Sequence, residues 1–468
     1  MPFVAEKQIL WPMICVACSS AYELGPPLLG HSATPYALCT PRGRSPRRIA
    51  DSLQQRFQMA FVDGTKPNIL FLAHRVPYPL DKGDRIRTFH ILRFLASRVR
   101  VHLACLADEP VTDEAQQALA GVCHRLHIVP LGKKIGLVRG FGSLVCGRTV
   151  TEGAFSSGGL RRLIRQWAAE TRFQAAMGSA SSMAPYLRLP ELADVPAVLD
   201  LMDVDSEKWL DYSRARSWPL SWVFRTEGRR LRRLEQEMAQ WARAVMLVSE
   251  AEADVFRSFC PWDGIHAVSN GVDLDYFQPA VDDTASGGCA FVGALDYYPN
   301  VDAAVWFCQE VWPSIHQRYP QLTFSLVGRR PTAAVQRLAD VPGVKVVGQV
   351  PDVRPYLSRA NVVVAPLRIA RGLQNKVLEA LAAGKAVVAS PPALAALKCQ
   401  PGVELQSASS PTEWVRAILH LLENQELRKE LGLAGRKYVE GHHAWDVCLE
   451  PLNDLLGLTK GSLCQLSS

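Results

Sequence analysis

The sequence lacks the long hydrophobic runs that mark membrane-spanning chains. No run of eighteen or more uncharged apolar residues occurs, whereas a helix that crosses a bilayer needs about twenty. A secretory signal needs a basic start and a compact apolar stretch that ends in small residues, and Ile9–Cys18 matches this pattern poorly. We therefore expect no membrane-spanning segment and no export.

A zinc site is also not expected from the cysteines. The twelve cysteines are scattered, and only Cys15 and Cys18 form a C-x-x-C pair, with no second pair or histidine cluster to complete a site. Several others lie inside apolar runs, where a free cysteine behaves as a small buried residue. This usage indicates a reducing cytoplasm, and the expected location is cytoplasmic, with association at the inner face of the plasma membrane as an alternative.

The chain has only a modest excess of positive charge. The net charge of +7 fits anionic ligands or an acidic membrane surface and does not require nucleic acid, which we do not expect as a partner. At 468 residues the chain is too long for one ordinary domain. Its 48% hydrophobic and 21% charged residues are typical of a globular protein that buries large cores.

The first 65 residues differ from the rest. They contain Pro26-Pro27, the basic stretch Pro41–Arg48 and no sustained periodicity. We interpret this region as a disordered extension or as a misassigned start upstream of Met59.

From Asn68 onwards, short apolar runs alternate with helical stretches. The predicted strands form two series, Ile69–Leu72, Val101–Leu106, His127–Leu131, Ala175–Met177, Ala197–Leu201, Val245–Val248 and Ile265–Val268, then Ala290–Val292, Phe324–Val327, Val344–Val347, Val362–Ala365 and Ala386–Ala389. Uninterrupted apolar strands between helices indicate parallel sheets covered on both faces. The sequence predicts an α/β fold with two doubly wound, Rossmann-like domains, residues 66–272 and 273–440. A helix and tail at 441–468 are expected to cross back to the first domain.

The segment Arg371–Ser390 holds the most information about function. Gly372 permits a tight loop before a helix expected over Leu373–Ala383, and Gly384 ends that helix. A helix N-terminus offers amide N–H groups and partial positive charge, which suits a diphosphate. Lys376 and Glu379 share one helix face, so that one can meet phosphate while the other accepts hydrogen bonds from ribose hydroxyls. Taken alone, Glu379 would be interpreted as a solvated carboxylate.

This segment resembles the family 4 retaining glycosyltransferases, whose two Rossmann-like domains face each other across a cleft in the GT-B architecture. Glu379-Ala380 and Gly384–Ala389 match the family's second glutamate and the turn into its Val-Val strand, so the resemblance implies that Glu379 binds the donor ribose. Arg371 replaces the first glutamate, which in the family reaches the transferred sugar, and is expected to bind diphosphate or an acidic sugar instead. The resemblance covers about residues 66–455, and is greatest to the exosortase-associated (PEP-CTERM system) sugar transferase subgroup.

The same resemblance assigns roles to residues that follow the other predicted strands. Donor binding falls to Gly293, Asn300, Gly328, Arg330, Gly348, Val350, Gly372, Leu373, Gln374, Asn375 and Glu379. Stabilisation of the leaving diphosphate falls to Arg329, Arg371 and Lys376. In the first domain, the acceptor or cleft residues are His74, Lys82, Gly83, Asp84, Arg85 and Asp203. A lone histidine such as His74 is more often a structural hydrogen-bonding residue than a base.

The resemblance implies transfer of a sugar from a nucleotide-sugar to a glycan or lipid-linked acceptor, in exopolysaccharide or cell-surface glycan synthesis. Retention of configuration and independence of metal and cofactor are expected.

Three alternatives stay open. Asp203-Val204-Asp205 has the D-x-D spacing of metal-dependent transferases. A nucleotide-sugar epimerase would use the same fold without an acceptor. A non-catalytic, membrane-associated assembly protein would use the basic and aromatic residues 214–243, including Trp218, Trp222, Phe224 and Trp241, against anionic lipid.

Overall fold

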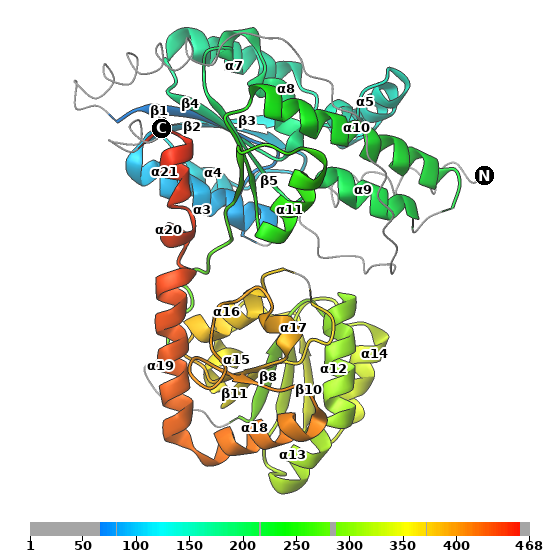
Figure 1. Ribbon diagram of the computed structural model, residues 1–468, viewed down its shortest axis with the longest axis vertical. Coiled ribbons are helices and arrows are strands. Elements are labelled where there is room, and N and C mark those ends of the chain that lie inside the picture. The colour runs from blue at the N-terminus through cyan, green and yellow to red at the C-terminus, as the bar shows by residue number, and fades with distance from the viewer. Residues whose placement is uncertain (1–65, 81, 215–216, 281–286, 371, 459–468) are drawn as a thin grey trace. The chain divides into compact units, whose positions relative to one another are not determined.

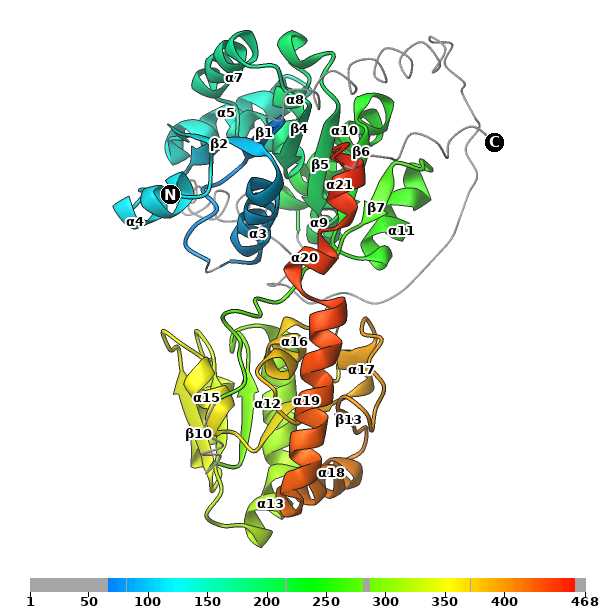
Figure 2. The same ribbon diagram turned by 90° about the vertical axis from the view of Figure 1, so that its left-hand side faces the viewer.

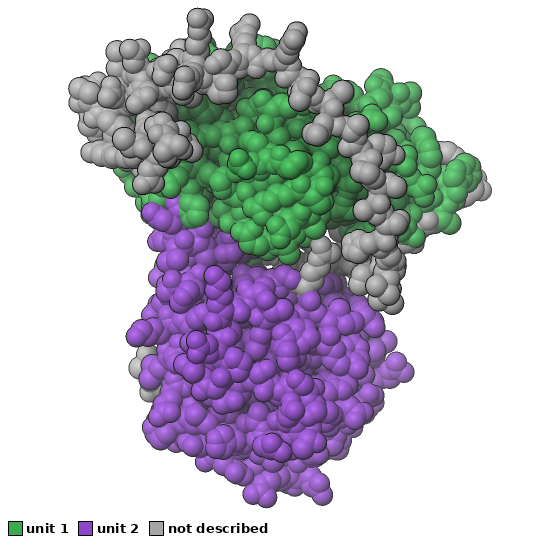
Figure 3. All heavy atoms as spheres, viewed as in Figure 1, with its two compact units in different colours: residues 1–21, 26–268, 451–468 green, residues 22–25, 269–450 purple. Residues whose placement is uncertain are grey.

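The computed structural model describes residues 66–80, 82–214, 217–280, 287–370 and 372–458, so the expected extension at 1–65 lies outside the described residues. The described chain forms two compact units, called unit 1 (residues 66–268 and 451–458) and unit 2 (residues 269–450) (Figure 3). Each unit contains one parallel sheet covered by helices (Figures 1 and 2). This confirms the predicted α/β fold with two doubly wound sheets.

Unit 1 has a seven-stranded sheet in the order β3-β2-β1-β4-β5-β6-β7. Its strands are β1 (Asn68–Ala73), β2 (Arg100–Ala107), β3 (Arg125–Pro130), β4 (Ala175–Ser179), β5 (Ala197–Met202), β6 (Ala244–Leu247) and β7 (Ile265–Ala267). Its helices are α3 (Gly83–Arg98), α4 (Asp113–Ala120), α5 (Lys133–Val145), α6 (Val150–Ala154), α7 (Gly158–Glu170), α8 (Ala184–Leu187), α9 (Asp205–Arg214), α10 (Leu220–Trp241), α11 (Glu250–Phe259) and α21 (Pro451–Leu455). The strand order reverses between β1 and β4, and ligands of such sheets bind beyond the carboxyl ends of the strands at that reversal.

Unit 2 has a six-stranded sheet in the order β10-β9-β8-β11-β12-β13. Its strands are β8 (Cys289–Val292), β9 (Phe324–Val327), β10 (Val344–Gly348), β11 (Val362–Ala365), β12 (Val387–Ala389) and β13 (Gln406–Ser407). Its helices are α12 (Tyr298–Glu310), α13 (Trp312–Arg318), α14 (Ala333–Gln336), α15 (Arg354–Arg359), α16 (Asn375–Ala382), α17 (Pro391–Leu394), α18 (Pro411–Glu423), α19 (Gln425–His442) and α20 (Trp445–Cys448). Here the order reverses between β8 and β11.

The C-terminal segment of the described chain belongs to unit 1. The side chain of Gln174 donates to the carbonyl of Gly457 at 2.6 Å, and Arg243 donates to the carbonyl of Asp454 at 3.2 Å. The continuous residues 269–450 of unit 2 are thus inserted between two parts of unit 1. None of the helices in the described ranges is long and apolar enough to cross a membrane.

The predicted strands fall within a residue or two of the observed ones, and β13 was missed because its two half-buried polar residues give no apolar signal. The helix predicted from Leu373 begins at Asn375 instead. Gly372 has φ +65°, and Gln374 is still extended at φ −95° and ψ 93°, so the turn uses two more residues than expected.

A buried ion pair fixes α3 to the centre of the sheet in unit 1. Asp200 on β5 accepts hydrogen bonds from Arg87 on α3, from Nε at 2.9 and 3.0 Å and from Nη2 at 2.9 Å. Both residues are fully buried. A paired guanidinium and carboxylate satisfy each other's hydrogen-bonding groups, whereas either one alone would be a buried charge without compensation.

We expect Asp200→Ala to lower the free energy of unfolding of unit 1 by about 3–5 kcal/mol, because it leaves the Arg87 guanidinium buried without its partner. The control is Glu170→Ala, which removes the exposed Arg125–Glu170 pair (2.7 Å) and is expected to lower the free energy of unfolding much less, because exposed ion pairs contribute little to stability. Urea unfolding followed by circular dichroism measures both. Equal losses in the two variants would contradict this role.

Candidate functional site

Three residues meet beyond the carboxyl end of β8, at the strand reversal of unit 2. A Cβ atom placed on Gly293 would lie 2.9 Å from Asn300 Nδ2 and 3.2 Å from Lys376 Cε. Asn300 lies in the first turn of α12, and Lys376 lies in the first turn of α16. A glycine at position 293 is therefore what allows side chains from two helices to converge over the backbone.

The loops after β8, β9 and β10 are stacked closely through glycines. A Cβ atom on Gly328 would lie only 1.7 Å from the carbonyl oxygen of Gly293. Gly328 in turn donates its N–H to the carbonyl of Gly348 at 2.9 Å. Gly348 adopts φ +78°, and a Cβ there would meet no atom within 4 Å, so the outer end of this stack is open.

Lys376 and Glu379 are half-buried on the same face of α16. Burial lowers the pKa of Lys376 to about 8, although the nearby Glu379 carboxylate opposes this shift. Burial likewise raises the pKa of Glu379, and Lys376 opposes it. The Lys376 ammonium donates to Gln374 Oε1 at 3.2 Å, whereas the Glu379 carboxylate has no hydrogen-bond or ion-pair partner among the described residues. Half-buried ionisable groups with spare hydrogen-bonding capacity are typical of binding sites.

Two further polar groups near Lys376 are available to a ligand. Asn300 is 3% exposed, and its Nδ2 donates to the carbonyl of Ala294 at 2.9 Å, while its Oδ1 has no partner in the described structure. The N-terminus of α16 has no side-chain cap, because Gln374 Nε2 donates back to the carbonyl of Gly372 at 3.2 Å. The first N–H groups of a helix have no partners within it and carry partial positive charge. This end of α16 therefore favours an anion.

The basic residues expected to neutralise a diphosphate differ in their surroundings. Arg330 is exposed, has φ +51° and forms an ion pair with Asp296 at 2.9 Å. Arg329 is half-buried, and its guanidinium has no partner among the described residues. Arg371 lies outside the described residues. Of the two arginines after β9, Arg329 is thus the one whose charge is not already paired.

The remaining donor residues named from the sequence lie on the loops of the same sheet edge. They are half-buried or exposed, except for the buried Gln374, and comprise Val350 after β10 and Gly372, Leu373, Gln374 and Asn375 at the start of α16. The structure joins Gly293, Asn300, Gly328, Lys376 and Gln374 by close approach or hydrogen bonds.

In unit 1, His74 is part of a buried network at the reversal between β1 and β4. The His74 ring lies 3.6 Å from Asp84 Oδ2 through Nε2 and 3.5 Å from Ser179 Oγ through Nδ1. Arg75 donates to the same Asp84 oxygen at 3.3 Å. Burial alone would raise the pKa of Asp84, but His74 and Arg75 together hold it well below its usual range. His74 is 2% exposed, so its present contacts are structural.

The carboxylates of Asp203 and Asp205 both lie near the Lys208 ammonium and do not form an open pair of metal ligands. Lys208 lies 2.9 Å from Asp203 and 3.6 Å from Asp205, and Ser181 donates to Asp205 at 2.5 Å. Within the described ranges, no group of three or more His, Cys, Asp or Glu residues is placed to hold a metal ion. The preceding residue Met202 has φ +66°, a strained conformation for a side-chain-bearing residue.

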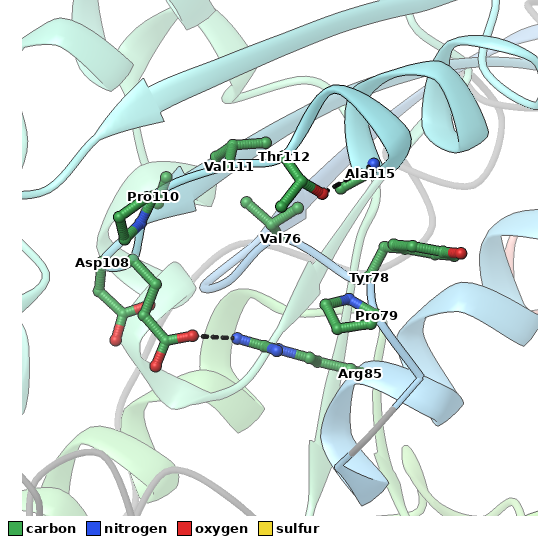
Figure 4. A pocket seen from close by; sticks show the side chains of 11 residues that line it. Val76, Tyr78, Pro79, Arg85, Asp108, Pro110, Val111, Thr112 and Ala115 are labelled. Atoms are coloured by element: carbon green, nitrogen blue, oxygen red, sulfur yellow. Dashed lines mark hydrogen bonds and ion pairs between the residues drawn. The ribbon is translucent and has the colours of Figure 1, made fainter. Parts of the chain in front are cut away.

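A small pocket opens beyond the carboxyl ends of β1 and β2 (Figure 4). Arg85 lines it and donates to Glu109 Oε2 at 2.8 Å, while Lys82 lies 3.8 Å from the same carboxylate. Gly83 is the first residue of α3. Glu109 was not among the residues predicted from the sequence, although its position two residues after the end of β2 is a usable signal.

The basic and aromatic segment at 214–243 is only partly a surface. Phe224 is buried in the core of unit 1, which corrects its assignment to a lipid-facing group. Arg232 is paired with Glu207, and Arg230 donates to the carbonyls of Leu144 and Arg148 at 2.6 and 2.7 Å. The exposed aromatic residues are Trp218 at 80% and Trp222 at 56%.

Comparisons with known proteins agree with this geometry. Residues 287–424, a range that contains Gly293, Lys376 and Glu379, match the family described as Glycosyl transferases group 1. The chain has no significant match among curated proteins. Solved structures with a similar fold include HepE from Anabaena in complex with UDP, at 14% identity over 84% of this chain and 100% of that chain (TM-score 0.57). Sucrose-phosphate synthase from Thermosynechococcus elongatus is similar at 16% identity over 84% and 99% (TM-score 0.57).

A third similar structure is WaaG, a glycosyltransferase involved in lipopolysaccharide biosynthesis, at 13% identity over 84% and 100% (TM-score 0.54). At such identities these likenesses establish the fold, which is GT-B. The family match supports a glycosyltransferase.

We expect Gly328→Ala to destabilise unit 2 by about 1–3 kcal/mol, because its methyl group cannot fit beside the Gly293 carbonyl without moving one of the loops. Gly441→Ala on α19 is the matched control, since a Cβ there meets no atom within 4 Å. It should stabilise the helix by at most about 1 kcal/mol. Urea unfolding of the two variants gives the comparison, and a neutral Gly328→Ala would show that the loops are not tightly stacked.

Proposed function

We propose that the chain transfers a sugar from a nucleotide-sugar, bound at the β8–β11 crevice of unit 2, to an acceptor bound by unit 1. The observation that carries this proposal is the pair Lys376 and Glu379, half-buried on one face of α16 beside Gly293 with hydrogen-bonding capacity to spare. HepE, which shares the fold, was solved with UDP and with UDP-glucose, which supports a nucleotide-sugar as the donor.

Each part of a nucleotide-sugar has a complementary group at this site. The diphosphate lies against the N-terminus of α16 and the Lys376 ammonium, where amide N–H groups and positive charge favour it. The ribose hydroxyls donate to the Glu379 carboxylate, which has no competing partner among the described residues. The glycine stack of Gly293 and Gly328 lets the backbone approach the phosphates closely.

Departure of the nucleoside diphosphate is the step that this site assists. The bond between the anomeric carbon and the phosphate oxygen breaks, and its electron pair goes to the diphosphate. The acceptor oxygen bonds to the anomeric carbon, and its proton passes to the departing diphosphate. The negative charge that develops on the leaving group is therefore what the site has to stabilise. Fixed cations and amide dipoles perform this task without reorganising during the reaction. Lys376, Arg329 and the α16 N-terminus supply them here.

The finer assignments follow from the sequence resemblance. They are retention of configuration, independence of metal and cofactor, membership of family 4 near the exosortase-associated subgroup, and a glycan or lipid-linked acceptor in exopolysaccharide or cell-surface glycan synthesis. The acceptor site is assigned to the carboxyl edge of the unit 1 sheet, near His74, Arg85 and Asp203. Arg371 is assigned to the diphosphate or to an acidic donor sugar.

A thermal-shift panel tests the donor site. We expect one of the UDP-, GDP- or dTDP-sugars to raise the melting temperature of the full chain, because a ligand that binds only the folded state stabilises it by mass action. Glu379→Ala and Lys376→Ala should abolish this rise. Glu430→Ala, an exposed carboxylate on α19, is the matched control and should keep it. Equal shifts in wild type and Glu379→Ala would remove Glu379 from the site.

Two activity measurements, in which the donor and its products are followed, separate the alternatives. Donor consumption that stops with EDTA and returns with Mn²⁺ would favour the metal-dependent mechanism. A free epimer that forms without any acceptor would favour an epimerase, whereas transfer requires an acceptor and keeps the anomeric configuration of the donor.

Donor affinity should also depend on pH through Lys376. The pKa of this ammonium is about 8, so the free protein is mostly protonated there at pH 7 and mostly neutral at pH 9. A diphosphate prefers the charged form, and its dissociation constant should therefore rise by up to about tenfold between these pH values. In Lys376→Arg the charge persists, and the affinity should stay flat. Isothermal titration of wild type and variant measures this, and parallel pH profiles would exclude Lys376 as the titrating group.

A further inference from the structure

Helix α5 exposes apolar side chains on the face that points away from its own unit. Ile135, Val138, Phe141 and Val145 are 56%, 73%, 61% and 78% exposed. Their spacing places them on one side of the helix. The opposite side packs inward, where Leu144 is 6% exposed and a Cβ on Gly140 would lie 3.0 Å from Val150. An ordinary surface helix has polar residues where α5 has these four.

Helix α10 lies next to the end of α5 and adds basic and aromatic residues. Arg230 joins the two helices through its hydrogen bonds to the carbonyls of Leu144 and Arg148. The exposed face of α10 carries Trp222, Arg225, Arg229 and Arg233, spaced three, four and four residues apart, and the exposed Trp218 precedes the helix. We call the exposed residues of α5 and of this face of α10, with Trp218, the α5–α10 surface.

Acidic residues are missing from the exposed part of the α5–α10 surface. Residues 131–151 contain no aspartate or glutamate. Of their exposed cations, Lys134 and Arg139 have no ion-pair partner among the described residues, whereas Arg148 is paired with Glu152 at 3.2 Å. Residues 217–233 contain one acid, Glu227, which is fully buried and accepts hydrogen bonds from the backbone of Val150 and Thr151. The surface therefore presents apolar groups bordered mainly by positive charge.

We propose that the α5–α10 surface binds an anionic lipid membrane, with α5 lying in the plane of the interface. The apolar face of α5 enters the boundary between headgroups and acyl chains, Trp218 and Trp222 lie at headgroup level, and the lysine and arginine side chains contact anionic headgroups. This surface is independent of the donor site, since every residue in it belongs to unit 1.

Charge argues against the other occupants of this surface. A second copy of the chain would bring the same cations opposite one another, and like charges across an interface are unfavourable. The N-terminal residues 1–65 include the basic stretch Pro41–Arg48, which would be repelled in the same way. An extended surface of negative charge above an apolar layer fits both features at once.

Vesicle flotation of the full chain tests the proposal without any sugar donor, so its outcome is separate from that of the transferase assay. We expect the protein to float with phosphatidylcholine vesicles that contain one-third phosphatidylglycerol and not with pure phosphatidylcholine, and binding should weaken at high salt. The double variant Val138→Glu/Val145→Glu should lower the bound fraction at least about tenfold. Both positions are more than two-thirds exposed, so the fold should be retained, which circular dichroism and melting temperature verify.

Leu433→Glu is the matched control, because Leu433 is an apolar residue on α19 of unit 2 that is 70% exposed. It should bind vesicles as the wild type does. Arg225→Gln/Arg229→Gln should weaken binding to anionic vesicles while leaving the fold unchanged.

Three results would overturn the proposal. The first is equal flotation of Val138→Glu/Val145→Glu and wild type, and the second is wild-type binding that does not depend on anionic lipid. The third is a lower molar mass of the double variant in light scattering without vesicles, which would identify a second copy of the chain as the occupant.

Discussion

The close approach of Gly328 to the carbonyl of Gly293 is the constraint on which the proposed donor site depends. It draws the loops after β8 and β9 together, so that Asn300 and Lys376 can reach over the backbone from two different helices. A side chain at either glycine would separate the loops or displace the lysine. The shape of the proposed site thus depends first on backbone packing, at the strand reversal between β8 and β11, and the charged side chains are added to that shape.

Burial and mutual attraction have opposing effects on the charges of Lys376 and Glu379. Burial disfavours both the Lys376 ammonium and the Glu379 carboxylate, and each partly offsets the cost of the other. The pair keeps a cation and a carboxylate three residues apart on α16 without joining them in a direct ion pair. Such an arrangement leaves both groups able to bind a ligand, whereas in unit 1 Arg87 and Asp200 are joined directly by hydrogen bonds.

The strands, and the glycines and charged residues that follow them, could be predicted from the sequence because apolar runs, glycines and helix signals are local features. Pairings between distant residues could not. Nothing local indicates that Asp296 forms an ion pair with Arg330, or that Glu109 forms one with Arg85. Phe224 was wrongly predicted to face lipid for the same reason, since the spacing of apolar residues in α10 does not show which of its faces is covered by a neighbouring element. The exposed stripe of α5 was missed because its apolar residues have the spacing of an ordinary core-facing helix.

The insertion of unit 2 into unit 1 has a consequence for biosynthesis. Unit 2 is a single stretch of chain and can complete its sheet while the ribosome is still adding residues. Unit 1 cannot be completed at that stage, because the hydrogen-bond partners of Gln174 and Arg243 lie in the segment around α21. That segment is translated after unit 2 and the rest of unit 1. A nascent chain stalled before that segment would carry a completed unit 2 and a unit 1 that still has an uncovered flank.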